Sequence, residues 1–152
     1  MYKKTINFLT KNWKIILYVF LVGLAINTVW EVLHSFLYSC TDSLKEHIPM
    51  LVRATFWDAG FIIALYLFMA FLKEDSNWVK KINKKDVILI LFVGFISATT
   101  VELHALYLGK WGYREFMPLV PYLKVGLTPF LQLAFTSLTT FLIVKGISID
   151  KS

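Results

Sequence analysis

The sequence predicts an all-α fold, in which four transmembrane helices of a polytopic membrane protein form one bundle. Hydropathy is the first observation: 57% of the 152 residues are hydrophobic, and the mean hydropathy of +0.63 exceeds that of globular domains. The second is that apolar residues gather in four blocks of about 20 residues, the length that a helix needs to cross a bilayer. We therefore expect a single domain over residues 1–152, with helices at about 15–37, 51–72, 87–108 and 119–144.

The distribution of positive charge is the third observation, and it predicts the topology. Lys and Arg residues number four before the first block, five between the second and third, and two after the fourth, whereas the other two connections and their helix ends hold five. By the positive-inside rule, both termini are expected in the cytoplasm. The net charge of +6 then indicates contact with anionic lipid in a multi-pass protein of the cell membrane, and not binding to nucleic acid.

The first apolar block follows several lysines, as the apolar region of a signal peptide does. It continues, however, into Asn27, Glu31 and His34, and no small-x-small cleavage site follows it. We therefore expect a retained helix. The single cysteine, Cys40, excludes an internal disulfide and lies at the predicted outer end of this helix.

The connections between the later blocks differ in character. Residues 73–86 are polar and charged around Trp78 and Val79, a pattern that fits either a short amphipathic turn on the membrane surface or a solvated linker. Residues 109–121 read GKWGYREFMPLVP, and this mixture of glycines, prolines and aromatic residues predicts a structured loop at the membrane interface. Pro129, inside the fourth block, predicts a kink near residues 125–128.

Ionisable side chains inside the predicted spans require an explanation, because each costs on the order of 2.5–3.5 kcal/mol at the centre of a membrane helix. In the first helix, a rotation of about 100° per residue places Asn27, Glu31 and His34 on one face. Glu31, Asp58 and Glu102 all fall roughly 9–12 Å below the outer surface at a rise of about 1.5 Å per residue. The polar groups are therefore expected in one layer of the bundle.

This layer predicts a cavity in the membrane that opens to the outer side. Glu102 and His104 face nearly opposite directions on one helix, so we assign Glu102 alone to the site. The predicted catalytic residues are Glu31, His34, Asp58 and Glu102. The predicted substrate-binding residues, some of which form a roof, are Asn27, Trp111, Tyr113, Arg114 and Gln132.

Several functions fit such a cavity. Carboxyl groups in a layer of low dielectric can act as acid and base, which favours an enzyme that acts on a lipid or isoprenoid-like substrate. A metal site formed by Glu31, His34 and Glu102 is an alternative, as is a lipid-binding protein without catalysis. A third is a scaffold or accessory subunit, in which the polar groups neutralise one another, for instance Arg53 with Glu31. The sequence does not decide whether the protein is an enzyme, nor does it identify a cofactor.

The partners follow from the same observations. Membrane lipids are the expected partners, and a homo-oligomer or a membrane partner protein stays open. A channel is disfavoured, because the predicted inner halves of the helices are almost wholly apolar, whereas a path through the membrane needs polar residues along its length.

The segment ELHALYLGKWGYREFMPLVPYLKVGLTPFLQL resembles a pattern found in a family of small, uncharacterised four-helix prokaryotic integral membrane proteins. That pattern is a glutamate followed by G-[KR]-W-x-Y, M-P and G-[LI]-x-P-x-x-Q. Such proteins similarly carry a Trp-Glu pair in the first helix, as Trp30 and Glu31 do here, and an aspartate in the second, as Asp58 does. The resemblance implies the four-helix fold and no particular activity. The matching residues are Glu102, Gly109, Lys110, Trp111, Tyr113, Met117, Pro118, Gly126, Leu127, Pro129 and Gln132.

Overall fold

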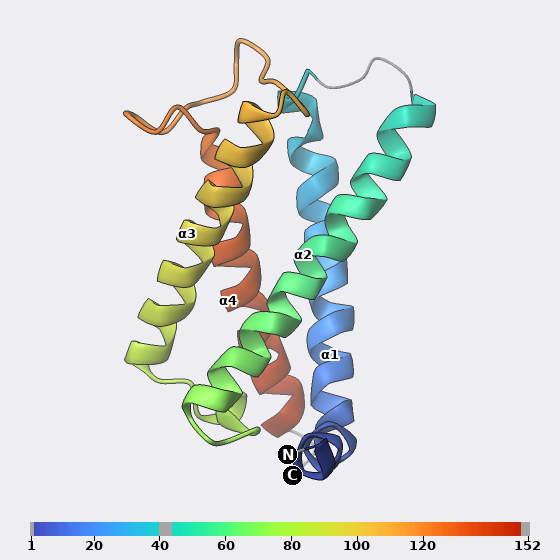
Figure 1. Cartoon of the computed structure of the whole chain (residues 1–152), viewed down its shortest axis with the longest axis vertical. Coiled ribbons are helices and arrows are strands. Elements are labelled where there is room, and N and C mark those ends of the chain that lie inside the picture. The colour runs from blue at the N-terminus through green and yellow to red at the C-terminus, as the bar shows by residue number, and fades with distance from the viewer. Residues whose placement is uncertain (1, 40–43, 150–152) are drawn as a thin grey trace.

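The computed structural model describes residues 2–39 and 44–149, and its regular structure in these ranges is helical, without strands (Figure 1). Cys40 lies outside the described residues. The described part of the chain contains four helices long and apolar enough to cross a membrane, over Asn12–Leu37, Ile48–Leu72, Lys84–Tyr107 and Leu127–Ser148. This confirms the all-α prediction with four such helices. The elements are α1 (Tyr2–His34), η1 (Ser35–Leu37), α2 (Leu44–Leu72), η2 (Trp78–Lys81), α3 (Lys84–Tyr107) and α4 (Leu127–Ile149).

Three helix starts differ from the prediction. The first helix begins at Tyr2 and not near residue 15, so it extends well before the apolar block. The second helix begins at Leu44 and not near residue 51, and it includes Pro49. The fourth begins at Leu127, because residues 119–126 belong to the loop before it. The predicted kink at Pro129 was therefore wrong: Pro129 lies in the first turn of α4, where a backbone N–H has no partner within the helix.

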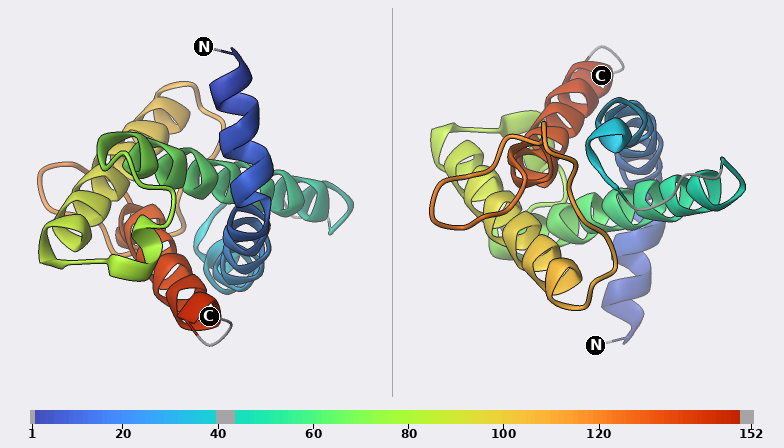
Figure 2. Two further views of the ribbon diagram at one scale, coloured as in Figure 1. Left: turned by 90° about the horizontal axis from the view of Figure 1, so that it is seen from below. Right: turned by 90° about the horizontal axis from the view of Figure 1, so that it is seen from above.

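The four helices form an incomplete ring in chain order, which is open between α2 and α3. Packing interfaces join α1 to α2, α1 to α4 and α3 to α4, whereas α2 and α3 make at most slight contact. At the end of the bundle that carries the loop 108–126, α2 leans away from α3 (Figures 1 and 2). The backbones of α3 and α4 lie close together at Gly94, since a Cβ on Gly94 would lie 2.4 Å from Ala134 Cα. One side of the bundle is thus left without helix packing.

The opposite end of the bundle is closed by an apolar core. Trp78 and Val79 of η2 are buried in it, and the Trp78 ring stacks on Tyr66 and meets Phe141 edge-on. The Trp78 Nε1 donates a hydrogen bond of 3.2 Å to the Tyr66 carbonyl oxygen. The interpretation of residues 73–86 as a solvated linker was therefore wrong for Trp78 and Val79, which belong to the core. The position of this short turn at the membrane surface stays a prediction. The helix α1 begins and α4 ends at this same end (Figure 1).

Candidate functional site

The polar face of α1 points into the bundle, as predicted. Asn27, Glu31 and His34 are 0%, 8% and 7% exposed. Asn27 donates a hydrogen bond of 2.9 Å from its amide to the Gly23 carbonyl oxygen, which fixes its side chain along the helix. Because Glu31 lies on the same buried face of α1, its carboxyl group lies inside the bundle.

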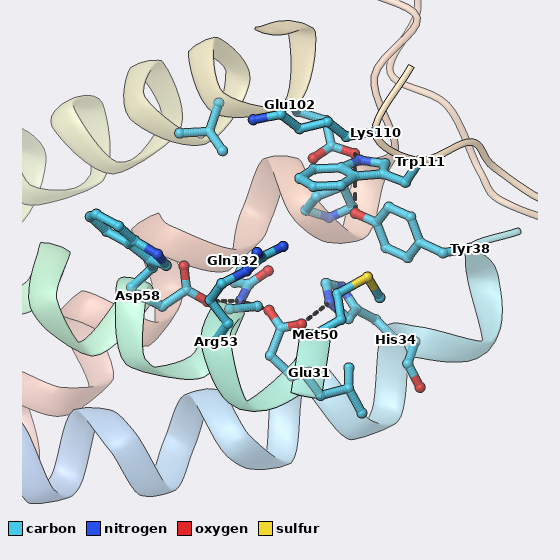
Figure 3. A pocket seen from close by; sticks show the side chains of 16 residues that line it. Glu31, His34, Tyr38, Met50, Arg53, Asp58, Glu102, Lys110, Trp111 and Gln132 are labelled. Carbon is cyan, nitrogen blue, oxygen red and sulfur yellow. Dashed lines mark hydrogen bonds and ion pairs between the residues drawn. The ribbon is translucent and has the colours of Figure 1, made fainter. Parts of the chain in front are cut away.

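A row of hydrogen bonds connects three helices inside the bundle (Figure 3). The Gln132 Nε2 donates to Glu31 Oε1 at 2.7 Å and to Asp58 Oδ2 at 2.6 Å. His34 Nε2 lies 3.3 Å from Glu31 Oε2. An amide nitrogen has two N–H groups, so these two short bonds use both. The row His34–Glu31–Gln132–Asp58 brings an imidazole and two carboxyl groups together, a set that can accept, hold and return a proton.

Glu102 belongs to a second cluster, on α3. Its Oε1 accepts hydrogen bonds from Tyr38 Oη at 3.1 Å, Trp111 Nε1 at 3.1 Å and Tyr113 Oη at 2.6 Å. Two of these donors come from the loop 108–126, and the third, Tyr38, directly follows η1. Glu102, which is 3% exposed, thus joins that loop to two helices.

Gly109 lies at the second position of the loop 108–126, just after the end of α3, and has a φ of +62°, which glycine adopts readily. Backbone hydrogen bonds then pair Tyr38 with Tyr113, from Ser39 N to Gly112 O and from Arg114 N to Leu37 O. The guanidinium of Arg114 is exposed and donates to the Tyr38 carbonyl oxygen at 3.0 Å. The first half of the loop is therefore fixed to the end of α1.

The second half of the loop folds back onto α4. A second backbone pairing joins Leu119 to Gly126, and the Gly126 N–H donates to Tyr113 Oη at 2.8 Å. A Cβ on Gly126 would lie 3.0 Å from the sulfur of Met117, which is itself buried. The motif positions Trp111, Tyr113, Met117 and Gly126 thus build one compact roof.

A cavity of about 810 Å³ lies beneath this roof, on the side where α2 and α3 do not pack together (Figure 3). This volume is in the range of sites for small organic molecules, about 300–1,000 Å³. Both polar clusters reach it, and apolar side chains such as Met50, Leu51, Trp57 and Val101 form much of the rest of its wall. The cavity therefore combines a proton-active set with a surface suited to an apolar ligand.

Most of the predicted site residues meet at this cavity. Its lining includes Glu31, His34, Asp58, Glu102, Trp111 and Gln132. Asn27 is not among the lining residues, and its Oδ1 lies 3.5 Å from Gln132 Nε2. Tyr113 and Arg114 do not line the cavity and instead hold the loop, while His104 is exposed outside it.

Two lining cations were absent from the predicted site. The sequence suggested Arg53 as an ion-pair partner of Glu31, and Lys110 as part of the loop motif, yet both line the cavity. The pair of Arg53 with Glu31 does not form, and Glu31 contacts His34 instead. The sequence contained a signal for each residue. Arg53 is a charge inside a predicted span, and Lys110 is a lysine within the loop motif.

The metal alternative receives no support from the geometry. Among the described residues, no group of three or more His, Cys, Asp or Glu side chains is arranged to hold a metal ion. Glu102 Oε1 is surrounded by three donors instead, and His34 and Glu31 contact each other.

The two tyrosines that donate to Glu102, Tyr38 and Tyr113, stay protonated far into the alkaline range. Burial, followed by the negative charge of Glu102, raises the pKa of Tyr38 well above its ordinary value of 10.0. Burial and the hydrogen bond to Glu102 likewise raise the pKa of Tyr113. Both phenols therefore remain hydrogen-bond donors to Glu102 at neutral pH.

Comparison with protein-family models, curated proteins and solved structures found no match to this chain.

Replacing Glu102 by alanine should destabilise the protein, because three donors lose a shared acceptor. Hydrogen bonds to a charged group contribute about 1.5–3 kcal/mol each and are not additive, so we expect a loss of about 3 kcal/mol and a fall in melting temperature of roughly 6–12 °C. Thermal unfolding of the detergent-solubilised protein measures this. Glu115→Ala, which removes an exposed carboxyl group from the same loop, is the control and should leave the melting temperature nearly unchanged. Equal melting temperatures for Glu102→Ala and the wild type would contradict this role.

The raised pKa of Tyr113 predicts how stability depends on pH. A phenol whose pKa is higher in the folded state contributes stability that is complete below its unfolded pKa of about 10 and is lost as pH rises beyond it. The raised pKa itself can be measured by absorbance. Because Tyr113 keeps its proton near pH 10 in the folded state, the folded wild type and Tyr113→Phe should gain the same tyrosinate absorbance at that pH. A smaller gain in the variant would show that Tyr113 titrates normally.

Proposed function

We propose that the chain is a multi-pass protein of the cell membrane, with both termini in the cytoplasm and the cavity in the outer leaflet. In this cavity it binds a lipid or isoprenoid-like molecule and transforms it by acid–base chemistry. The observation that carries the proposal is the hydrogen-bonded row His34–Glu31–Gln132–Asp58 in a cavity that is otherwise largely apolar.

The distribution of side chains supports insertion into a membrane. Buried positions of α4 include Thr136, Ser137 and Thr140, none more than 1% exposed, whereas Leu33 and Phe71 are 69% and 79% exposed. In water, large apolar side chains are normally buried. Helices with polar residues inside and apolar residues outside are suited to lipid as the surrounding medium.

The position of the carboxyl groups supports acid–base chemistry. Removing a carboxyl group from water is costly, so groups buried without a structural need point to function. Glu31 and Asp58 both line the cavity, on different helices, and contact one amide. In the proposed reaction, one of them, assisted by His34, takes a proton from the bound molecule and the other returns one.

The closed end of the bundle favours this function over transport. The core around Tyr66, Trp78 and Phe141 fills the half of the bundle away from the cavity with apolar side chains. A site that is open on one side only suits an enzyme or a lipid-binding protein.

The proposed topology predicts opposite labelling of two exposed loops. In a Cys40→Ser background, a cysteine at Lys110 should react with a membrane-impermeant maleimide on intact cells. One at Lys81, whose side chain is 79% exposed, should react only after the membrane is permeabilised. The reason is that the two loops lie at opposite ends of the helices. Labelling of both from one side would contradict the four-span topology.

The proposed chemistry predicts that the bound molecule changes when a carboxyl group is removed. We would purify the full chain gently, with its native lipids, identify the bound mass by native mass spectrometry, and separate isomers of the released molecule by chromatography with fragmentation. Glu31→Gln and Asp58→Asn keep the shape of the site but remove its acid or base, so both should accumulate an unconverted isomer, with the same mass as the molecule on the wild type but a different retention time. Glu115→Gln, outside the cavity, is the matched control.

The alternatives give different results in the same measurement. The same bound isomer in all four proteins would indicate lipid binding without catalysis. No bound molecule in any of them, together with a co-purifying membrane protein, would favour the scaffold or accessory subunit.

A further inference from the structure

Two positive charges line the cavity without a negative partner. Arg53, on α2, and Lys110, in the loop after α3, are exposed and form no ion pair or side-chain hydrogen bond with any described residue. They approach the cavity from different elements, and Figure 3 shows both among its lining side chains. Arg53 also lies within a span, where an unpaired charge is costly. Arg53 and Lys110 therefore favour a ligand that carries an anionic group.

A third group in the cavity lacks a partner. His34 is 93% buried and lines the cavity, and its Nδ1 has no hydrogen-bond partner among the described residues. A buried polar atom of this kind normally finds a protein group, a water or a ligand. Its Nε2 contacts Glu31, so Nδ1 is the nitrogen of this lining residue that is left without a partner.

The open side of the bundle provides a route for an apolar chain. Trp57 on α2 and Val101 on α3 both line the cavity and are 75% and 56% exposed. Because α2 and α3 make at most slight contact, these apolar residues border a lateral opening rather than a closed wall. In a membrane, this opening would face lipid tails.

We propose that the ligand is a lipid with a phosphate headgroup, which enters sideways between α2 and α3. Arg53 and Lys110 bind the phosphate, His34 Nδ1 contacts the headgroup, and the apolar chain leaves past Trp57 and Val101 into the membrane. A phosphate suits this arrangement because it offers several oxygens and up to two negative charges to groups on different elements. The inference rests on the proposed function and names the class of its substrate.

Lipid binding to the purified full chain in dodecyl maltoside micelles tests this inference. The probes are dioleoyl phosphatidic acid, dioleoylglycerol, which lacks the phosphate, and inorganic phosphate, which lacks the chains. We expect phosphatidic acid to bind about tenfold more tightly than dioleoylglycerol, and inorganic phosphate to compete only weakly.

Variants connect this preference to the two cations. Arg53→Gln with Lys110→Gln should reduce the affinity for phosphatidic acid to that for dioleoylglycerol. Lys124→Gln removes an exposed positive charge of the same loop outside the cavity and should leave binding unchanged. Val101→Trp, which narrows the lateral opening, should slow the binding of phosphatidic acid.

The remaining outcomes separate this inference from the proposed function. Equal affinity for the two lipids, lost in both cases with Gln132→Leu, would overturn the phosphate assignment and leave the proposed function standing. Unchanged binding in the double variant would also overturn the assignment. Inorganic phosphate that binds as tightly as the lipid would overturn the choice of a lipid. No binding of either lipid would overturn the phosphate-lipid inference, whereas the proposed function fails only if the gently purified chain also carries no bound molecule.

Discussion

The amide of Gln132 is the interaction on which the cavity depends. Its two N–H groups bind Glu31 of α1 and Asp58 of α2 while its backbone belongs to α4, so one side chain joins three helices. A buried carboxyl group without a donor would cost several kcal/mol, so the presence of this amide allows two carboxyl groups to face the interior. It also holds α2 at the level of the cavity, although α2 leans away from α3.

Glu102 is also a buried carboxyl group that needs hydrogen-bond donors, but its donors are aromatic side chains and not the Gln132 amide. Its acceptor oxygen is surrounded by Tyr38, Trp111 and Tyr113, which are the residues that fix the loop over the cavity. We accordingly assign Glu102 to positioning and reserve proton transfer for the row that contains Glu31 and Asp58. In the proposed function, one set of buried polar groups thus fixes the loop, and the other faces the bound molecule.

The sequence predicted the components of the site better than their grouping. Helix periodicity placed Glu31 and His34 on one face of α1, because positions three apart on one helix have a fixed geometry. The pairing of Gln132 with two carboxyl groups, the separation of Glu102 from them, and the entry of Arg53 and Lys110 into the cavity depend on contacts between elements. Local rules do not fix those contacts.

Four apolar blocks determined the fold class, since their length and hydropathy leave helices long enough to cross a membrane as the consistent solution. The tertiary structure alone decided where α4 begins, because the loop 119–126 is held by its pairing with itself and with Tyr113. It also buried Trp78 in the core and left α2 apart from α3. Hydropathy is a property of each segment, whereas an opening between helices is created only by the way in which all four pack.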